Sequence, residues 1–80
     1  MLNSDRKLNS GGERVRFRIK EHRQKIGMSQ QELSDKSGVS RAIISGLESG
    51  RITVTSTGTL AKIADVLNIE IGDIFFRKGA

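Results

Sequence analysis

The stretch RAIISGLES, residues 41–49, carries residue types and a spacing that suit the recognition of another surface. Wound as an α-helix, this stretch turns by about 100° per residue. One side of the helix then holds an arginine followed only by small side chains: Arg41, Ala42, Ser45, Gly46 and Ser49. The opposite side is apolar, so we expect the helix to bury that side and to leave the small side open.

The small side favours close approach to a large partner surface. A helix that needed only solubility would carry long charged residues there, because glycine costs about 1 kcal/mol relative to alanine in a helix. The major groove of B-DNA, about 12 Å wide, admits such a helix, and a leading arginine can donate two hydrogen bonds to O6 and N7 of guanine. Two alternatives remain for these nine residues: a core helix whose small side is accidental, or a helix that packs against another protein.

Residues for enzyme chemistry are scarce in this chain. It has no cysteine, no tyrosine and one histidine, and it lacks both a glycine-rich phosphate loop after a strand and a carboxylate cluster with catalytic spacing. His22 has no cysteine or second histidine with which to hold a metal, so we expect it to pack half-buried. We therefore expect no enzyme activity, no metal, no cofactor and no small-molecule ligand.

The positive charge is concentrated at the front of the chain. The formal net charge is +5, and residues 1–25 contain eight basic and three acidic residues, whereas the charges of the later residues balance. This pattern indicates a polyanionic partner, either nucleic acid or an anionic membrane surface, with a solvated charged helix as the alternative. No apolar run approaches the roughly 20 residues that span a bilayer, so we expect a soluble, cytoplasmic protein.

Five short helices and no sheet are expected to position these residues. The first covers residues 13–26 and ends at Gly27, and its buried stripe consists of Val15, Ile19, His22 and Ile26. Because apolar and basic residues in VRFRI at its start also alternate with the period of a strand, a strand is the alternative to a helix before Phe17. Residues 1–12 precede this helix as a flexible tail.

A capping box opens the second helix. In SQQE, residues 29–32, the Ser29 hydroxyl can accept from the amide of Glu32 while the Glu32 carboxylate reaches back to the amide of Ser29. We expect this helix to run to about residue 37, where a tight turn leads to a third helix capped by Ser40. Two short helices joined by such a turn fit helix-turn-helix geometry.

The remainder of the chain holds a connector and two more helices. Residues 51–58 form a β-branched, hydroxyl-rich connector. The next helix buries a stripe at i, i+3, i+4 and i+7, which comprises Leu60, Ile63, Ala64 and Leu67. A last short helix in GDIFF is expected to bring three residues to the core: Ile71, Ile74 and Phe75.

The chain resembles the Cro/cI-like (Xre-type) helix-turn-helix family in SQQELSDKSGVSRAIISGLESG, followed by TLAKIADVLNIEIGDIF. The resemblance implies an all-α fold, a compact five-helix lambda-repressor-like DNA-binding domain at residues 13–76. Residues 77–80 would then be a short C-terminal tail. The resemblance also implies binding to double-stranded operator DNA, usually palindromic, by a symmetric homodimer.

The same resemblance implies roles for individual residues. Contacts to base edges fall on Arg41, Ala42, Ser45 and Gly46, and contacts to phosphates fall on Gln30, Ser40, Arg51 and Thr53. Arg23 and Glu48 match a structural ion pair between the first and third helices of the family. Weaker phosphate candidates are Arg16, Arg18, Lys20, Gln31, Lys36 and Thr55.

Three features depart from the family pattern. Gly46 stands where relatives often carry a long polar residue, which leaves more of the specificity to Arg41, to DNA shape or to the N-terminal arm. Ile43 stands where a small hydroxyl residue is common, and it either extends the core or touches a deoxyribose. The loop after the third helix is one residue longer and lacks the usual proline, so its DNA contacts stay open.

These observations predict a sequence-specific DNA-binding transcriptional regulator, a small dimeric repressor or controller that reads operator half-sites with residues 41–49. We expect Phe75 to pack in the core, so its neighbour Phe76 should be exposed, and it is the candidate dimer contact. The alternative is a protein-interaction module such as a toxin-neutralising antitoxin, with DNA binding secondary or absent. Membrane-surface binding through VRFRIKEHRQKI is a weaker third hypothesis.

Overall fold

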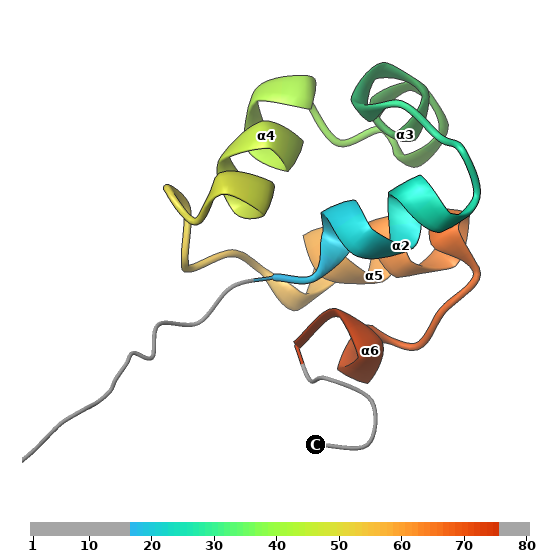
Figure 1. The fold of residues 1–80 in the computed structure, drawn as a ribbon. Coiled ribbons are helices and arrows are strands. Elements are labelled where there is room, and N and C mark those ends of the chain that lie inside the picture. Colours follow the sequence, from blue (N-terminus) through green and yellow to red (C-terminus); the bar gives the residue numbers. More distant parts are fainter. Residues whose placement is uncertain (1–16, 76–80) are drawn as a thin grey trace, which may run out of the picture.

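The computed structural model describes residues 17–75, in which five helices and no strand are present. The helices are α2 (Ile19–Lys25), α3 (Gln30–Ser37), α4 (Arg41–Ser49), α5 (Thr57–Leu67) and α6 (Ile71–Phe75). In Figure 1, α3 and α4 lie side by side at one end, α2 and α5 form the middle, and α6 closes the opposite end. The all-α prediction is therefore confirmed for the described residues.

Serine hydroxyls begin three of these helices. Ser29, Ser40 and Ser56 have extended backbones, and each hydroxyl accepts from the amide three residues later at 3.0 to 3.2 Å. The predicted capping box is complete, since Glu32 Oε1 accepts from the Ser29 amide at 3.1 Å. The cap at Ser56 starts α5 at Thr57, inside the segment that the sequence predicted as a connector.

Ser29→Ala should lower the free energy of unfolding by about 1 kcal/mol, because the Glu32 amide loses its acceptor at the start of α3. Urea denaturation followed by circular dichroism measures this change. Ser34→Ala, in the interior of the same helix, is the matched control and should leave stability unchanged or slightly higher, because alanine is the better helix former. Equal stability of the two variants would show that water replaces the capping hydroxyl without cost.

The apolar core forms where the five helices meet. Its fully buried large side chains come from every helix: Ile19, Leu33, Ile44, Leu47, Ile63 and Ile74. The stripe predicted for α5 is buried over its whole length, from Leu60 to Leu67. Burying one such side chain contributes roughly 1.5–3 kcal/mol of hydrophobic free energy. This burial fixes the rotation of α4 about its axis, so that its apolar side faces inward.

The first helix is shorter than the sequence predicted. α2 begins at Ile19, and residues 13–16 lie outside the described residues, as do the predicted tails at 1–12 and 77–80. Ile26, expected on the buried stripe, is 56% exposed because α2 ends before it and the chain turns away at Gly27, where φ is +68°. Phe17, just before the helix, is buried instead.

The last helix also differs from the prediction. Ile74 is fully buried, but Phe75, expected inside, is 39% exposed. Its ring meets the ring of Phe17 edge to face with centroids 5.4 Å apart, so Phe75 covers the core from outside. Phe76, the predicted dimer contact, lies outside the described residues.

Candidate nucleic-acid interface

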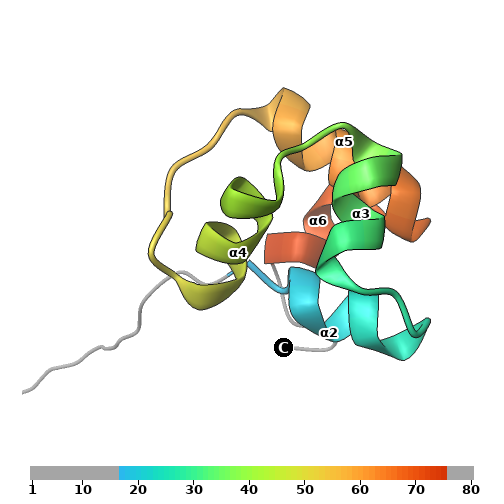
Figure 2. The same cartoon turned by 90° about the horizontal axis from the view of Figure 1, so that it is seen from above.

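A three-residue turn, residues 38–40, joins α3 to α4 and sets how the two helices face a partner. Gly38 has a left-handed backbone with φ +76°, which glycine adopts without steric cost, and its amide donates to Ser34 O at 2.9 Å. The Val39 amide donates to Ser37 Oγ at 3.1 Å, and the Val39 side chain is buried. The turn is therefore held in place, and Figure 2 looks from above onto the helix pair that it joins.

α4 presents its leading residues to solvent. Arg41 and Ala42 are exposed at the front of the helix, and Ser45, one turn later, is partly exposed. Ile43 is 37% exposed, so it lies at the edge of this surface rather than in the core. Ser40 is exposed as well, and its oxygen, which accepts from the Ile43 amide, keeps a hydrogen that it can donate. Three of the four residues predicted to contact bases thus have accessible side chains.

Gly46 departs from the sequence prediction, because it is buried. A Cβ placed on it would lie 2.4 Å from Ile52 Cδ1 and 2.6 Å from Ile52 Cγ1, and the Ile52 amide donates to Gly46 O at 2.9 Å. The chain that follows α4 therefore returns over this glycine and covers it. Gly46 is therefore not accessible as a base contact in this structure, unlike the other three predicted residues. That Ile52 would cover α4 was not predicted from the sequence. The available signal was that Ile52 is an apolar residue in a mostly polar loop, two positions beyond the glycine that ends α4.

Arg23 and Glu48 form the ion pair that the resemblance implied between the first and third predicted helices. Arg23 Nε lies 2.8 Å from Glu48 Oε2, and Arg23 Nη2 lies 2.9 Å from Glu48 Oε1. The remaining amino group, Nη1, donates to Met28 O at 2.9 Å. The two side chains are only 10% and 4% exposed. This two-point contact fastens α2 to the rear of α4 and holds the angle at which α4 meets a partner.

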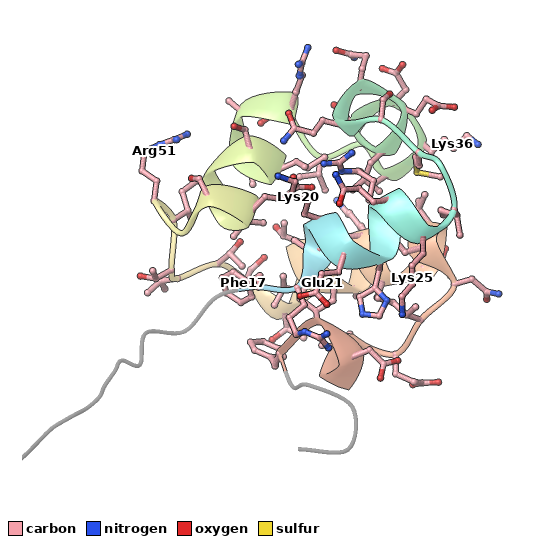
Figure 3. The ribbon with its side chains drawn as sticks, in the orientation of Figure 1. Phe17, Lys20, Glu21, Lys25, Lys36 and Arg51 are labelled. Carbon is pink, nitrogen blue, oxygen red and sulfur yellow. The ribbon has the colours of Figure 1, made fainter. Side chains whose placement is uncertain are left out.

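The environment shifts the ionisation of both partners. Burial by itself raises the pKa of Glu48, but hydrogen bonds from Arg23 and Gln30 and the charges of Arg23 and Lys20 outweigh it, so the pKa is lowered overall. The hydrogen bond to Glu48 raises the pKa of Arg23 above its ordinary value. Figure 3 shows Lys20 on the side of α2 that faces α4. Both members of the pair are therefore charged at neutral pH.

Gln30, predicted to contact a phosphate, has a partner inside the protein. Its Nε2 donates to Glu48 Oε1 at 3.0 Å, and the residue is partly buried at the first position of α3. An amide nitrogen carries two hydrogens, so one remains for an outside acceptor. Gln30 thus links the start of α3 to the Arg23–Glu48 pair. Sequence spacing gave no signal of this contact.

The loop after α4 is open to solvent. Arg51 and Thr53 are exposed, Thr55 is partly buried, and Val54 is 85% exposed. In Figure 3, Arg51 lies at the surface beside the end of α4, while Lys36 lies at the far side of α3. Arg51 and Thr53 are therefore accessible in the loop that directly follows α4.

The other described cations of α2 and of its N-cap residue, Arg18, lie on two different sides of the helix. Lys20 is exposed toward α4, whereas Arg18 pairs with Glu21 and its backbone amide donates to Ile74 O at 2.7 Å. Arg18 and Lys25 line a hollow of about 460 Å³ beside α6, together with His22, Asn68, Ile69, Glu70 and Asp73. His22 is half-buried there with Nε2 3.2 Å from Asp73 O, so neither His22 nor Arg18 belongs to the α4 surface.

Residues 17–75 show neither a cluster of metal-binding side chains nor a membrane-spanning helix. No group of three or more histidine, cysteine, aspartate or glutamate side chains is placed to hold a metal ion there. Within the same range, no helix has both the length and the apolar character needed to cross a membrane.

Comparisons with known proteins agree on the family. The sequence profile of the helix-turn-helix family matches residues 19–74. An uncharacterized HTH-type transcriptional regulator of Archaeoglobus fulgidus is 46% identical over 61 residues, which cover 76% of this chain and 86% of that relative. The N-terminal DNA-binding domain of SinR from Bacillus subtilis aligns with a TM-score of 0.73 and 32% identity, over 79% of this chain and 91% of that one.

A complex of SinR protein with SinI protein aligns equally well, with a TM-score of 0.72 and 32% identity over 78% of this chain and 60% of that chain. The profile match covers the described helices from the start of α2 to α6. It also includes the turn that joins α3 to α4 and the residues at the front of α4. The chain belongs to the Cro/cI-like (Xre-type) helix-turn-helix family of DNA-binding transcriptional regulators.

Proposed function

We propose that this regulator reads operator DNA by placing α4 in the major groove, with Arg41, Ala42 and Ser45 at base edges. The observation that carries the proposal is the rotation of α4, which buries Ile44 and Leu47 and leaves those three side chains accessible beside the α3–α4 turn. An arginine can donate to O6 and N7 of guanine, and an alanine methyl suits the methyl of thymine.

Phosphate contacts are assigned to Gln30, Ser40 and Thr53. Gln30 retains one amide hydrogen at the N-terminus of α3, an end of the helix that attracts anions. Ser40 retains its hydroxyl hydrogen at the N-terminus of α4, and Thr53 is exposed in the following loop. Contacts of this kind position a protein on the duplex without reading its sequence.

The proposal includes a homodimer on a palindromic operator, in which Phe76 contributes to the twofold contact. Support comes from the exposed ring of Phe75 next to it and from the symmetry that palindromic sites share with dimeric proteins. Such a dimer would act in the cytoplasm as a repressor or controller by occupying a promoter. The family is a class of DNA-binding regulators and not of enzymes.

Selection of bound sites from random double-stranded DNA tests the function. A recovered palindrome would give the operator, the half-site spacing and the symmetry together. Binding to that operator should weaken steeply with salt, by a log–log slope of about −0.9 for each phosphate neutralised, or about −5 for six phosphates. Failure to enrich any sequence, together with a shallow slope, would exclude operator recognition.

A protein-interaction module, such as an antitoxin, is the second candidate function. Two apolar side chains favour it, since Val54 is 85% exposed in the loop after α4 and Ile43 is 37% exposed on α4 itself. The SinR–SinI complex shows that a relative of this fold assembles with another protein. Association through apolar contacts depends little on salt, so the slope described above separates the two functions.

A further inference from the structure

The side chain of Arg51 lies across the small side of α4, where Gly46 leaves room for it. A Cβ placed on Gly46 would lie 3.2 Å from Arg51 Nη2, and Arg51 Nη1 lies 3.5 Å from Ser49 Oγ. Gly46 and Ser49 both belong to the small side that begins at Arg41. The Arg51 guanidinium therefore covers the rear half of the side whose front end carries Arg41.

The backbone on both sides of Arg51 is fixed. Gly50 ends α4 with a left-handed backbone at φ +86°, and the Arg51 amide donates to Ser49 Oγ at 3.2 Å. The Ile52 amide donates to Gly46 O at 2.9 Å, and its side chain occupies the space above the glycine. These contacts bring Arg51 over α4 before any partner binds, which lowers the entropic cost of using it in recognition.

The charge of Arg51 is available to a partner. No described carboxylate pairs with it, and the carboxylate of Glu48, three residues earlier, is engaged by Arg23 and Gln30. Arg51 is exposed, and Figure 3 shows it at the surface beside the end of α4. A guanidinium in this position can bind either a phosphate or a base edge. Its position against the small side of α4, which we propose faces the base edges, favours a base edge.

We propose that Arg51 is a second base-reading residue, which supplies from the loop the long polar side chain that Gly46 lacks. This inference rests on the proposed function of α4, and it replaces the phosphate contact that the resemblance implied for Arg51. Residues 41 and 46 are separated by about 7.5 Å along the helix axis, at 1.5 Å per residue. Base pairs stack at about 3.4 Å, so this distance spans at most about two base-pair steps, and we expect Arg51 to read a guanine within about two base pairs of the one read by Arg41.

Arg51→Lys separates base reading from phosphate contact, because lysine keeps the charge but loses the planar two-point donor. In site selection from random double-stranded DNA, the wild-type protein should show two preferred guanines in each half-site. Arg51→Lys should lower the preference at one of them by at least fivefold while the other preference and the salt slope stay unchanged. Arg41→Ala should affect the other guanine alone.

Gly46→Ala tests the role of the glycine, because Arg51 itself is kept. The added methyl would collide with the Ile52 side chain and would lie 3.2 Å from Arg51 Nη2, so both side chains have to move and the guanidinium leaves its place over Gly46. We expect relaxed preference at the Arg51 base pair only. Lys62→Ala, which removes an exposed charge from α5, is the control and should leave both preferences unchanged. Circular dichroism should show that all variants keep the helical fold.

The possible negative results separate three claims: the role of Arg51, the role of Gly46 and the proposed function of α4. If Arg51→Lys keeps both preferences and Arg51→Ala only weakens binding evenly while reducing the salt slope by about one, Arg51 contacts a phosphate and the inference is wrong. If Gly46→Ala keeps both preferences, the role given to Gly46 is wrong. If the wild-type protein selects no site, the proposed function fails as well, whereas a relaxed base pair in Arg41→Ala alone leaves that function in place.

Discussion

Glu48→Ala is expected to lower the free energy of unfolding by about 3–5 kcal/mol, which is the cost of breaking a buried ion pair from one side. The substitution leaves the Arg23 guanidinium in a site that is only about a tenth exposed, with Met28 O as its remaining acceptor. It also removes the acceptor of the Gln30 amide. Urea or thermal denaturation measures the loss, which is a large part of the 5–15 kcal/mol that holds a typical domain together.

Two controls give this experiment its meaning. Glu21→Ala removes a carboxylate whose ion pair with Arg18 is at the surface, and it should cost no more than about 1 kcal/mol. The double variant Arg23→Met/Glu48→Leu removes both buried charges and should be more stable than Glu48→Ala, because no unpaired charge stays behind. If Glu48→Ala costs no more than Glu21→Ala, the pair contributes as little as a surface pair and does not anchor α4.

The same pair makes stability depend on pH. The pKa of Glu48 is lower in the folded protein than in the unfolded chain, so folding favours the ionised form. This contribution is present in full above the unfolded value of about 4.3 and is lost as the pH falls through the lower folded value. Glu48→Gln should therefore flatten the acid side of a plot of unfolding free energy against pH.

Arg41→Ala is expected to lower affinity for the selected operator by about 5- to 150-fold, which corresponds to 1–3 kcal/mol for one two-point base contact. The loss should appear as relaxed preference at one base pair in each half-site. Arg41 is exposed at the front of α4, so the stability of the fold should not change. Competition binding with operators mutated at single base pairs measures the preference directly.

Arg41→Lys is the matched control, because it keeps the charge but not the two-point geometry. It should show the same relaxed base pair with a smaller loss of overall affinity. Uniform weakening of all sequences by Arg41→Ala, with no change of preference, would identify Arg41 as a phosphate contact instead. That result would leave Ala42 and Ser45 as the only base-edge contacts proposed on α4 itself.

Much of the fold could be predicted because its signals are local. The caps at Ser29 and Ser40 depend on residues within one helical turn, and the apolar stripe of α5 repeats with the helical period. The start of the first helix could not be predicted in this way. Phe17 is buried in the core just before α2, and its ring contacts the ring of Phe75, which lies far away along the chain; no local pattern indicates such contacts.

In the candidate site, too, the local features could be predicted from the sequence and the contacts between elements could not. The exposure of Arg41 and Ala42 follows from the rotation of one helix, which its own apolar residues set. The burial of Gly46 depends instead on the path of the loop after α4, which brings Ile52 back over the helix. Helical spacing placed Gly46 on the small side of α4, but it could not reveal that Ile52 from the following loop covers it.

The sequence by itself determined where most of the helices lie, which side of α4 is apolar and that a leading arginine stands on its small side. These properties come from hydrogen bonds and side-chain periodicity over a few residues. Only the tertiary structure decided that Gln30 binds Glu48, that Ile52 covers Gly46 and that Arg51 lies over α4. Those contacts join different elements or reverse the chain, so they exist only once packing has fixed the elements and loops in space.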